Sequence, residues 1–308
     1  MKCNITSADA DQRLDVWLAK KLSLSRSQAQ KQIKAGDITV NDRPVSAHLK
    51  IKEGDLIKAE NKKKTADRPV AKAKKDLLPL DIIDETDDYL VINKPAGLIM
   101  HDAGQKEADG LAEVLIDRYP KIVKVGDDPV RPGIVHRLDR DASGLVAIAK
   151  TQAFFEHLKA QFQARTIEKK YTALVYGKIN KDKGEIDFLL ERATSGHRMA
   201  AKPKSQTGKT AVSEFEVTGR FINYTLVRVK TKTGRTHQVR VHLSAYGYPI
   251  VGDDLYGTRL AKEKNKKSGC RRIFLVADEL AFTDLAGTRK YYKISLPDEF
   301  KAMLANIK

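Results

Sequence analysis

The chain has 308 residues, of which 41% are hydrophobic and 31% charged, a balance typical of a globular and not of a disordered protein. Its net charge of +17 favours a polyanionic partner, with nucleic acid ahead of an acidic membrane surface. Two cysteines, Cys3 and Cys270, are too few for a disulfide framework or a cysteine zinc site. No apolar segment approaches the ~20 residues that span a bilayer, and the N-terminus lacks a signal peptide's apolar core, so we expect a cytoplasmic protein.

The first residues predict a small domain in which two helices precede short strands. RLDVWLAKKL places Trp17 and Leu18 at helical spacing with the leucines around them, and RSQAQKQIKAG follows as a second helix. DITVNDRPV predicts a hairpin that turns at Asn41-Asp42, and IKEGDLI predicts a further short strand. We place this domain at residues 1–60.

This order of elements resembles the small αL-type RNA-binding module first described in a ribosomal small-subunit protein. The resemblance covers about residues 11–58, with SRSQAQKQIKAGDITVN as its most recognisable part. In that family the second helix and the turn after it lie on RNA, which implies phosphate contacts by Arg26, Lys31 and Lys34. Each of these side chains taken alone is more often a solvated surface residue.

Residues 61–76, NKKKTADRPVAKAKKD, predict a basic flexible linker. The segment has seven lysines and arginines, one proline and no hydrophobic period. It separates the small N-terminal domain from a large C-terminal one, which we place at residues 77–308. The linker is either a plain solvated spacer or a non-specific contact to RNA phosphates.

The large domain alternates strand and helix patterns without a βαβ repeat. YLVINKPAG predicts a strand that ends in a Pro-Gly turn, and SGLVAIAK predicts a buried strand before a helix that begins at Thr151. KKYTALVYGKI, AVSEFEVTGRF and YTLVRVKTKTG predict further strands, of which the last two pair as antiparallel neighbours, and HQVRVHLSAYG returns to helical spacing. The fold class is therefore α+β, with a mixed, mainly antiparallel sheet flanked by helices.

Common cofactor and metal motifs are missing from the sequence. It contains no G-x-x-x-x-G-K-[ST] loop, no G-x-G-x-x-G after a strand, no H-E-x-x-H and no G-x-S-x-G elbow. The seven histidines are scattered without the spacing of metal ligands. We therefore expect neither a cofactor nor a metal.

The densest cluster of charge is HRLDRD, residues 136–141, directly before the buried strand SGLVAIA. An aspartate held against an arginine stays ionised and oriented, and such a carboxylate can act as a nucleophile or a base. A solvated loop of salt bridges is the commoner explanation of such a cluster. The buried strand that follows argues against it and favours a protein-lined floor for Asp139.

PGIVHRLDRDASGLVAIAK closely resembles the signature of RNA pseudouridine synthases of the RluA branch, in which His-Arg-Leu-Asp precedes Ser-Gly-Leu. Three further stretches resemble motifs of that branch in the expected order: YLVINKPAGLIMH at 89–101, KKYTALVYG at 169–177 and KTGRTHQVRVHLSAYGYPIVGDDLYG at 232–257. The resemblance implies a pseudouridine synthase catalytic domain that isomerises uridine to pseudouridine in RNA without a cofactor. An αL-type module commonly accompanies such a domain.

The resemblance also implies roles for individual residues. Asp139 would be the catalytic carboxylate, acting either by addition to C1′ or by removal of the C2′ proton. Tyr171 would stack on the target base, and Arg240 would pair with Asp139, with Arg235 as the alternative. Arg137 would fill the gap left by the flipped uridine.

Other expectations are less specific. His136 either touches RNA or shapes the loop. Relatives with an N-terminal αL-type module favour large-subunit ribosomal RNA over transfer RNA as the target, and we expect a monomer. A catalytically silent RNA-binding or ribosome-assembly protein is the alternative. The chain departs from many relatives at Leu275-Val276-Ala277, where they carry Leu-His-Ala, and at Thr283-Asp284, where they carry His-Pro.

Overall fold

The computed structural model describes residues 2–22, 24, 26–59, 79–101, 110–193, 198–270 and 272–307. The chain divides into two compact units, Met1–Lys75 and Asp76–Lys308. The predicted linker at 61–76 lies outside the described residues. Within the described ranges no helix is long and apolar enough to cross a membrane.

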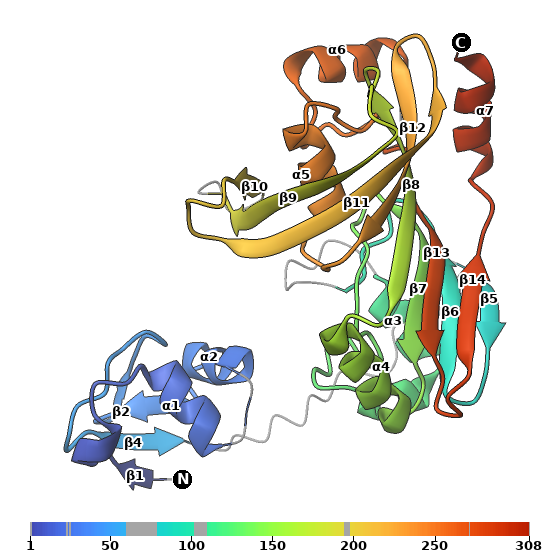
Figure 1. Ribbon diagram of the computed structural model, residues 1–308. Helices are drawn as coiled ribbons and strands as arrows, with labels where there is room; N and C mark the ends of the chain where they lie inside the picture. The colour runs from blue at the N-terminus through green and yellow to red at the C-terminus, as the bar shows by residue number, and fades with distance from the viewer. Residues whose placement is uncertain are drawn as a thin grey trace. The chain divides into compact units, whose positions relative to one another are not determined.

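The N-terminal unit is a four-stranded antiparallel sheet covered by two helices (Figure 1). Its sheet has the strand order β1-β4-β2-β3. Its elements are β1 (Lys2–Asn4), η1 (Ser7–Asp9), α1 (Leu14–Lys21), α2 (Arg26–Lys34), β2 (Ile38–Val40), β3 (Arg43–Pro44) and β4 (Leu56–Ala59). Asn41 and Asp42 join β2 to β3 with positive φ angles of 51° and 61°, the backbone that a two-residue hairpin requires. Both predicted helices and the predicted hairpin are confirmed.

The apolar side chains of the two helices meet the sheet in one core. Leu14 and Leu18 are fully buried, and Trp17 is nearly so, as the helical spacing predicts. Ile33 of α2 and Ile57 of β4 belong to the same cluster. The unit therefore has a hydrophobic core of its own.

The C-terminal unit is built on one ten-stranded sheet with the order β10-β9-β11-β12-β8-β13-β7-β6-β5, in which β14 also pairs with β13. Its strands are β5 (Asp81–Glu85), β6 (Tyr89–Lys94), β7 (Ser143–Ala149), β8 (Glu168–Tyr176), β9 (Lys183–Arg192), β10 (Met199–Lys202), β11 (Lys209–Arg220), β12 (Tyr224–Thr231), β13 (Leu275–Thr283) and β14 (Arg289–Lys293). Only β7 and β13 pair in parallel among the described strands, and the other pairs are antiparallel. The predicted α+β class with a mixed, mainly antiparallel sheet is confirmed.

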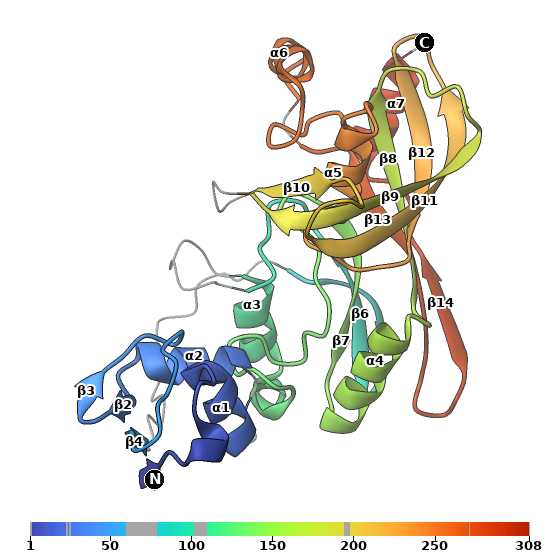
Figure 2. The ribbon, with the colours of Figure 1, turned by 60° about the vertical axis from the view of Figure 1, so that its left-hand side comes forward.

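Helices cover the sheet at separate places. They are α3 (Leu111–Arg118), η2 (Pro120–Lys124), α4 (Gln152–Ala164), α5 (Gln238–Ala245), α6 (Arg259–Lys267) and α7 (Asp298–Asn306). α4 packs on β7 and β13, whereas α5 packs on β9, β10 and β11, as the two views show (Figures 1 and 2). Thr151 begins α4 as predicted, because its hydroxyl accepts the backbone N–H of Phe154 at 3.3 Å.

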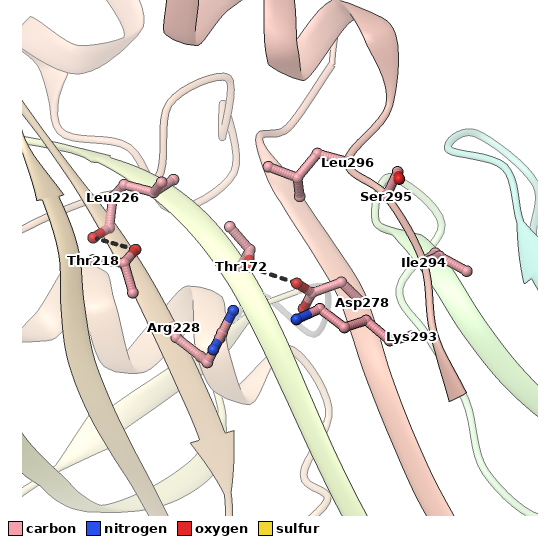
Figure 3. Close-up of a pocket in the computed structure, with 9 residues that line it drawn as sticks. All are labelled: Thr172, Thr218, Leu226, Arg228, Asp278, Lys293, Ile294, Ser295 and Leu296. Atoms are coloured by element: carbon pink, nitrogen blue, oxygen red, sulfur yellow. Dashed lines mark hydrogen bonds between the residues drawn. The ribbon is translucent and has the colours of Figure 1, made fainter. Parts of the chain in front are cut away.

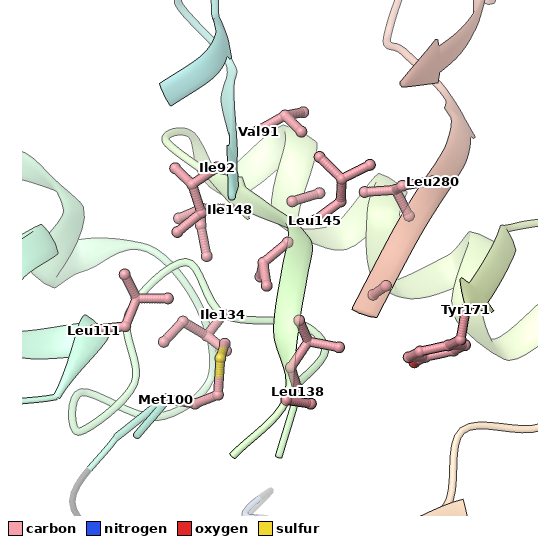
Figure 4. Close-up of a cluster of buried hydrophobic side chains, with 14 of the residues drawn as sticks. Val91, Ile92, Met100, Leu111, Ile134, Leu138, Leu145, Ile148, Tyr171 and Leu280 are labelled. Carbon is pink, nitrogen blue, oxygen red and sulfur yellow. The ribbon is translucent and has the colours of Figure 1, made fainter. Parts of the chain in front are cut away.

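β7 is buried along its whole length and supports the charged loop that precedes it. Its Gly144 has a φ of +124°, and a Cβ there would lie 2.3 Å from the carbonyl oxygen of Ala277 in β13. Only glycine therefore allows β7 and β13 to approach this closely. The main core cluster continues from β7 to Leu138 and Tyr171 (Figure 4).

Candidate active site

The loop at residues 135–142 places Asp139 next to the start of β7. Burial alternates along it: His136 and Leu138 point into the core, whereas Arg137 is exposed. The side chain of Asp139 follows with 13% of its surface exposed. The carboxylate therefore lies on a floor made by buried neighbours and still reaches solvent.

Arg240 supplies the cation beside Asp139. It lies in the first turn of α5, and its Nη1 is 3.6 Å from Asp139 Oδ2 and 3.7 Å from Asp141 Oδ2. Its shorter contacts go to Asp253, because Nε and Nη2 each donate to one carboxylate oxygen at 2.8 Å. Arg240 and Asp253 are both almost completely buried. This bidentate ion pair fixes the guanidinium and leaves Nη1, its third nitrogen, facing Asp139.

The charge of Arg240 is held by its acidic neighbours. Burial by itself would lower the pKa of Arg240, but the hydrogen bonds and charge of Asp253, with the charges of Asp139 and Asp141, raise it above its ordinary value. The carboxylate of Asp253 is itself oriented, since its Oδ1 accepts the backbone N–H groups of Leu255 and Tyr256 at 3.0 Å. The site therefore contains a fixed, permanent cation.

His237 approaches Asp139 from a second side. Its Nε2 is 3.9 Å from Asp139 Oδ1, and its Nδ1 is 2.7 Å from the hydroxyl of Tyr256. That hydroxyl accepts the N–H of Met199 at 2.8 Å and can donate its own hydrogen to Nδ1. In the tautomer that this donation requires, the ring proton is on Nε2, on the side of Asp139. Burial lowers the pKa of His237, and the opposing charge of Asp139 does not restore it.

The backbone of His237 adopts a conformation that residues other than glycine rarely take. Its φ is 55° and its ψ is 20°, in the left-handed region, directly before α5. Non-glycine residues in this region cluster at functional sites, where the surrounding structure holds them. The turn aims the imidazole toward Asp139 while Arg240 points to the same carboxylate from the following helix.

Lys94 ties the loop of Asp139 to the end of β6. It is completely buried, and its Nζ donates to three backbone carbonyls, those of Pro95 at 2.8 Å, Leu98 at 2.9 Å and Arg140 at 3.1 Å. The three N–H groups of an ammonium match these three acceptors. Burial lowers the pKa of Lys94 to about 8, and the charges of Asp139 and Asp141 oppose that effect.

Comparison with known proteins assigns the family. Residues 88–245 match the RNA pseudouridylate synthase family, and residues 12–57 match the S4 domain. This chain belongs to the RNA pseudouridine synthases. The predicted catalytic domain and the predicted RNA-binding module are thereby confirmed, and the protein is an isomerase with RNA as its partner.

Relatives and a solved structure agree with this assignment. The chain is 34% identical over 300 residues to the RNA pseudouridine synthase YlyB of Bacillus subtilis, which covers 96% of this chain and 94% of that one. It is 35% identical over 304 residues to ribosomal large subunit pseudouridine synthase D of Pseudomonas aeruginosa, with 96% and 91% covered. Human RNA pseudouridylate synthase domain containing 1 matches with a TM-score of 0.58 at 25% identity, over 74% of this chain and 87% of that one.

The structure distinguishes between Arg240 and Arg235, the two candidate partners of Asp139 that the sequence could not tell apart. Arg240 of the synthase lies 3.6 Å from the carboxylate. Arg235 precedes α5 and is turned elsewhere, since its Nε donates to the carbonyl oxygen of Thr210 at 3.2 Å. Arg240 is thus the residue positioned to pair with Asp139.

Tyr171 and His136 are both buried, but their neighbours differ. Tyr171 lies in β8 with 8% of its surface exposed, and Lys169 Nζ is 5.4 Å from its ring centroid. His136 Nε2 accepts the backbone N–H of Ala147 at 3.0 Å, and burial lowers the pKa of this histidine well below its ordinary value. This neutral, buried ring favours the loop-shaping role of His136 over RNA contact.

The predicted RNA contacts of the S4 domain fall on α2. Lys34, at its C-terminal end, is exposed. The side chains of Arg26 and Lys31 lie outside the described part of the synthase. In the described ranges no three histidine, cysteine, aspartate or glutamate side chains come together as a metal site requires.

Where the synthase departs from the pattern of its relatives, the replacement residues have local partners. Val276 is fully buried in an apolar cluster with Phe300 of α7, an environment in which valine needs no hydrogen-bond partner. Asp284 closes the turn between β13 and β14, because its carboxylate accepts the N–H of Thr288 at 2.8 Å.

Sequence reasoning did not single out Asp253, Tyr256, His237 or Lys94 as parts of this site. The first three lie inside the quoted stretch 232–257, where GDDLYG follows the arginine motif. The acidic pair of GDDLYG and the tyrosine that follows it were the available signal. Lys94 lies in YLVINKPAG, which predicts a strand and a Pro-Gly turn, and its three carbonyl contacts agree with such a structural role.

Proposed function

We propose that this synthase converts uridine to pseudouridine in large-subunit ribosomal RNA, with Asp139 as the group that reacts at the ribose. The observation that carries the proposal is the Asp139 carboxylate, which is mostly buried but reaches solvent and faces the fixed guanidinium of Arg240 at 3.6 Å. The RNA target rests on relatives named ribosomal large subunit pseudouridine synthases D and C, which are 30–35% identical and cover nearly the whole chain.

The reaction cuts the bond from C1′ to N1 of the base, rotates the base and joins C1′ to C5, after which C5 loses its proton. An ionised Asp139 serves either route to cleavage, since it can add to C1′ or remove the proton from C2′. Arg240 places a positive charge 3.6 Å from this carboxylate before the substrate arrives. Nε2 of His237 lies 3.9 Å from the other carboxylate oxygen, close enough to approach it when the substrate binds.

Access to the ribose requires the uridine to leave the RNA stack. Arg137 is exposed at the loop surface two residues before Asp139, a position from which it can fill the gap in the stack. Tyr171 offers an aromatic face for the extruded base. Lys34 and its neighbours on α2 of the S4 domain would contact RNA phosphates.

Asp139→Asn tests the role of the carboxylate. Replacing the proposed reacting carboxylate with a neutral amide should lower the rate of pseudouridine formation on the order of 10⁴-fold, while binding of the same RNA persists. Asp141→Asn is the matched control, because Asp141 lies at a similar distance from Arg240 but is 55% exposed. Its rate should stay within a few-fold of the parent. Undiminished turnover by Asp139→Asn would overturn the mechanism.

The target is tested separately by mapping pseudouridines in total cellular RNA with and without the gene. The proposal expects the missing sites to lie in large-subunit ribosomal RNA. Sites lost only from transfer RNA would reject this target while leaving the role of Asp139 intact. No change at any site, with an active purified enzyme, would reject the target as well.

A further inference from the structure

α6 is a strongly basic helix that begins three residues after Tyr256 of the candidate active site. Its sequence, RLAKEKNKK, has five lysines and arginines against one glutamate. Three residues of chain span at most about 11 Å, so the first turn of α6 lies close to Tyr256. In both views α6 stands out from the sheet above α5, the helix that carries Arg240 (Figures 1 and 2).

The inner side of α6 is fixed to the residue that precedes Asp253. Asn265 is 3% exposed, and its side-chain Oδ1 accepts the backbone N–H of Gly252 at 2.9 Å. Gly252 has a φ of +80°, and a Cβ there would lie 1.8 Å from the carbonyl oxygen of Arg272. Only glycine therefore lets the chain beyond α6 pack this closely. The helix is held in place at both of these contacts.

The exposed side of α6 carries positive charge that acids do not neutralise. In the part of the chain that the structure describes, three of its exposed lysines have no carboxylate oxygen within 4.0 Å: Lys262, Lys266 and Lys267. Glu263, the one acid of the helix, pairs with Arg259 at 3.1 Å, and Lys264 Nζ lies 5.5 Å from the ring centroid of Tyr176. Like charges four positions apart, as at 262 and 266, destabilise a helix, and a bound polyanion would relieve that repulsion.

Lysines on the face of the sheet that carries Thr172 are neutralised instead. Three of them have a glutamate oxygen at 2.9, 3.4 and 2.9 Å: Lys183, Lys230 and Lys232. A bulge in β13 turns both Asp278 and Glu279 to this face. Glu279 meets Arg228 and Lys293 at 3.7 and 3.5 Å, and Figure 3 shows these two cations around the pocket of Thr172. The unpaired charge of α6 is therefore a local feature of that helix.

The residues of α6 fit the phosphates of RNA better than a membrane surface. A helix that lies on a membrane buries a face of large apolar side chains opposite its basic face. The buried residues of α6 are Ala261 and Asn265, and its one large exposed apolar side chain is Leu260. Phosphate binding needs no apolar face, because it gains from the release of counterions by each ammonium group. RNA is also the substrate of the family to which the synthase belongs.

We propose that α6 is a binding surface for the sugar–phosphate backbone of the substrate RNA beside the active site, with Lys262, Lys266 and Lys267 as its phosphate contacts. Contacts of this kind position an RNA without reading its bases. The inference rests on RNA as the partner of the synthase. It is independent of the role of Asp139 and of which RNA is modified.

A triple variant of the full-length chain, with Lys262→Gln, Lys266→Gln and Lys267→Gln, tests these contacts. Glutamine forms helices about as well as lysine, so α6 should persist. The dissociation constant for RNA should rise by at least about tenfold, and the slope of its logarithm against the logarithm of the salt concentration should fall by about 2 to 3. Unmodified transcripts of large-subunit ribosomal RNA and of transfer RNA serve as two probes, so the result does not depend on the target.

The matched control removes the same charge from the sheet, by Lys183→Gln, Lys230→Gln and Lys232→Gln. Its dissociation constant should change by less than about threefold and its salt slope by less than about 1, because these lysines already have acidic partners. Equal losses in the two triple variants would show that only net charge matters and would overturn the proposal. A lower melting temperature of the α6 variant with unchanged RNA binding would also overturn it, since the lysines would then only stabilise the helix end.

Two further measurements separate charge from structure and RNA from membrane. Arginine at positions 262, 266 and 267 keeps the charge, so this triple variant should bind RNA within about threefold of the parent. Weak binding by this variant, when folded, would show that positive charge at these positions is not what binds RNA. Vesicles that contain phosphatidylserine are the second probe. If the glutamine variant lost vesicle binding but kept RNA binding, α6 would be a membrane surface and the proposal would be rejected.

Discussion

The two faces of β8 differ in how their polar groups are satisfied. On the face of Tyr171, the carboxylate of Asp139 meets an arginine that Asp253 holds with two hydrogen bonds of 2.8 Å. On the face of Thr172, a carboxyl oxygen of Asp278 and Nε of Arg228 are buried without partners. The first face is organised before any ligand arrives, whereas the second keeps its hydrogen-bonding capacity unused.

This difference has a physical meaning for the proposed reaction at Asp139. A reacting carboxylate works best when the charges around it do not have to rearrange during the reaction. The proposed site around Asp139 has such an arrangement, because buried partners hold the groups that face the carboxylate: Asp253 behind Arg240, Tyr256 behind His237 and Lys94 below the loop. If these partners organise the site, removing them one at a time should lower catalysis or stability in a graded way.

The largest effect is expected for Asp253→Asn. Loss of the negative charge leaves Arg240 buried without its main partner, which should lower the free energy of unfolding by about 3 kcal/mol. It also frees the guanidinium to turn from Asp139, so kcat should fall on the order of 10²-fold with little change in RNA affinity. Single-turnover assays and urea unfolding measure the two effects.

Asp254→Asn is the matched control for this prediction. Asp254 is the exposed neighbour of Asp253 and accepts Asn265 Nδ2 at 2.9 Å, away from Arg240. Its kcat should stay within a few-fold of the parent. If Asp253→Asn loses stability but keeps kcat, then Arg240 does not depend on Asp253 for its position. The face of β8 that carries Tyr171 would then not be organised by Asp253 before the ligand arrives.

The sequence predicts the individual helices and strands of this fold better than it predicts which of them pair or pack together. β7 and α4 follow from a continuous apolar run and a threonine cap, and the hairpin at Asn41-Asp42 follows from its residue types. The parallel pairing of β7 with β13 joins segments more than a hundred residues apart, and no local pattern encodes it.

The site shows the same limit. The ordered motifs predict that Asp139, Tyr171 and an arginine belong together, but they do not decide between Arg235 and Arg240. That choice depends on the left-handed turn at His237, which starts α5 and directs Arg240 inward. The bulge that turns Asp278 to the far face is likewise a property of strand register, which a single sequence does not specify.

The second prediction concerns pH and Lys94. The pKa of Lys94 is about 8 in the folded chain, whereas in the unfolded chain it has the ordinary value of 10.5. Between pH 8 and pH 10.5, therefore, the unfolded chain binds more protons at this residue than the folded chain does. Stability from this group therefore rises with pH across that window, by at most about 3 kcal/mol. Lys94→Met should abolish this rise, since methionine does not titrate.

Urea unfolding of both proteins from pH 7.5 to pH 10 checks the prediction. Other groups titrate in this range but are common to both chains, so only the difference matters. The parent should gain stability relative to Lys94→Met as the pH increases. Parallel curves would show that the ammonium of Lys94 is not destabilised by burial and that the loop is held in another way.

The smallest effect is expected for Tyr256→Phe. The change removes the hydroxyl that lies 2.7 Å from His237 Nδ1, so this contact no longer favours the tautomer with Nε2–H toward Asp139. One neutral hydrogen bond contributes about 1 kcal/mol, which predicts a roughly fivefold lower kcat. Tyr176→Phe is the control, because it removes a buried hydroxyl bonded to Asn265 Oδ1 at 2.8 Å, at a distance from Asp139. Both variants should lose similar stability, but only Tyr256→Phe should slow the reaction; equal rates would mean that His237 needs no fixed tautomer.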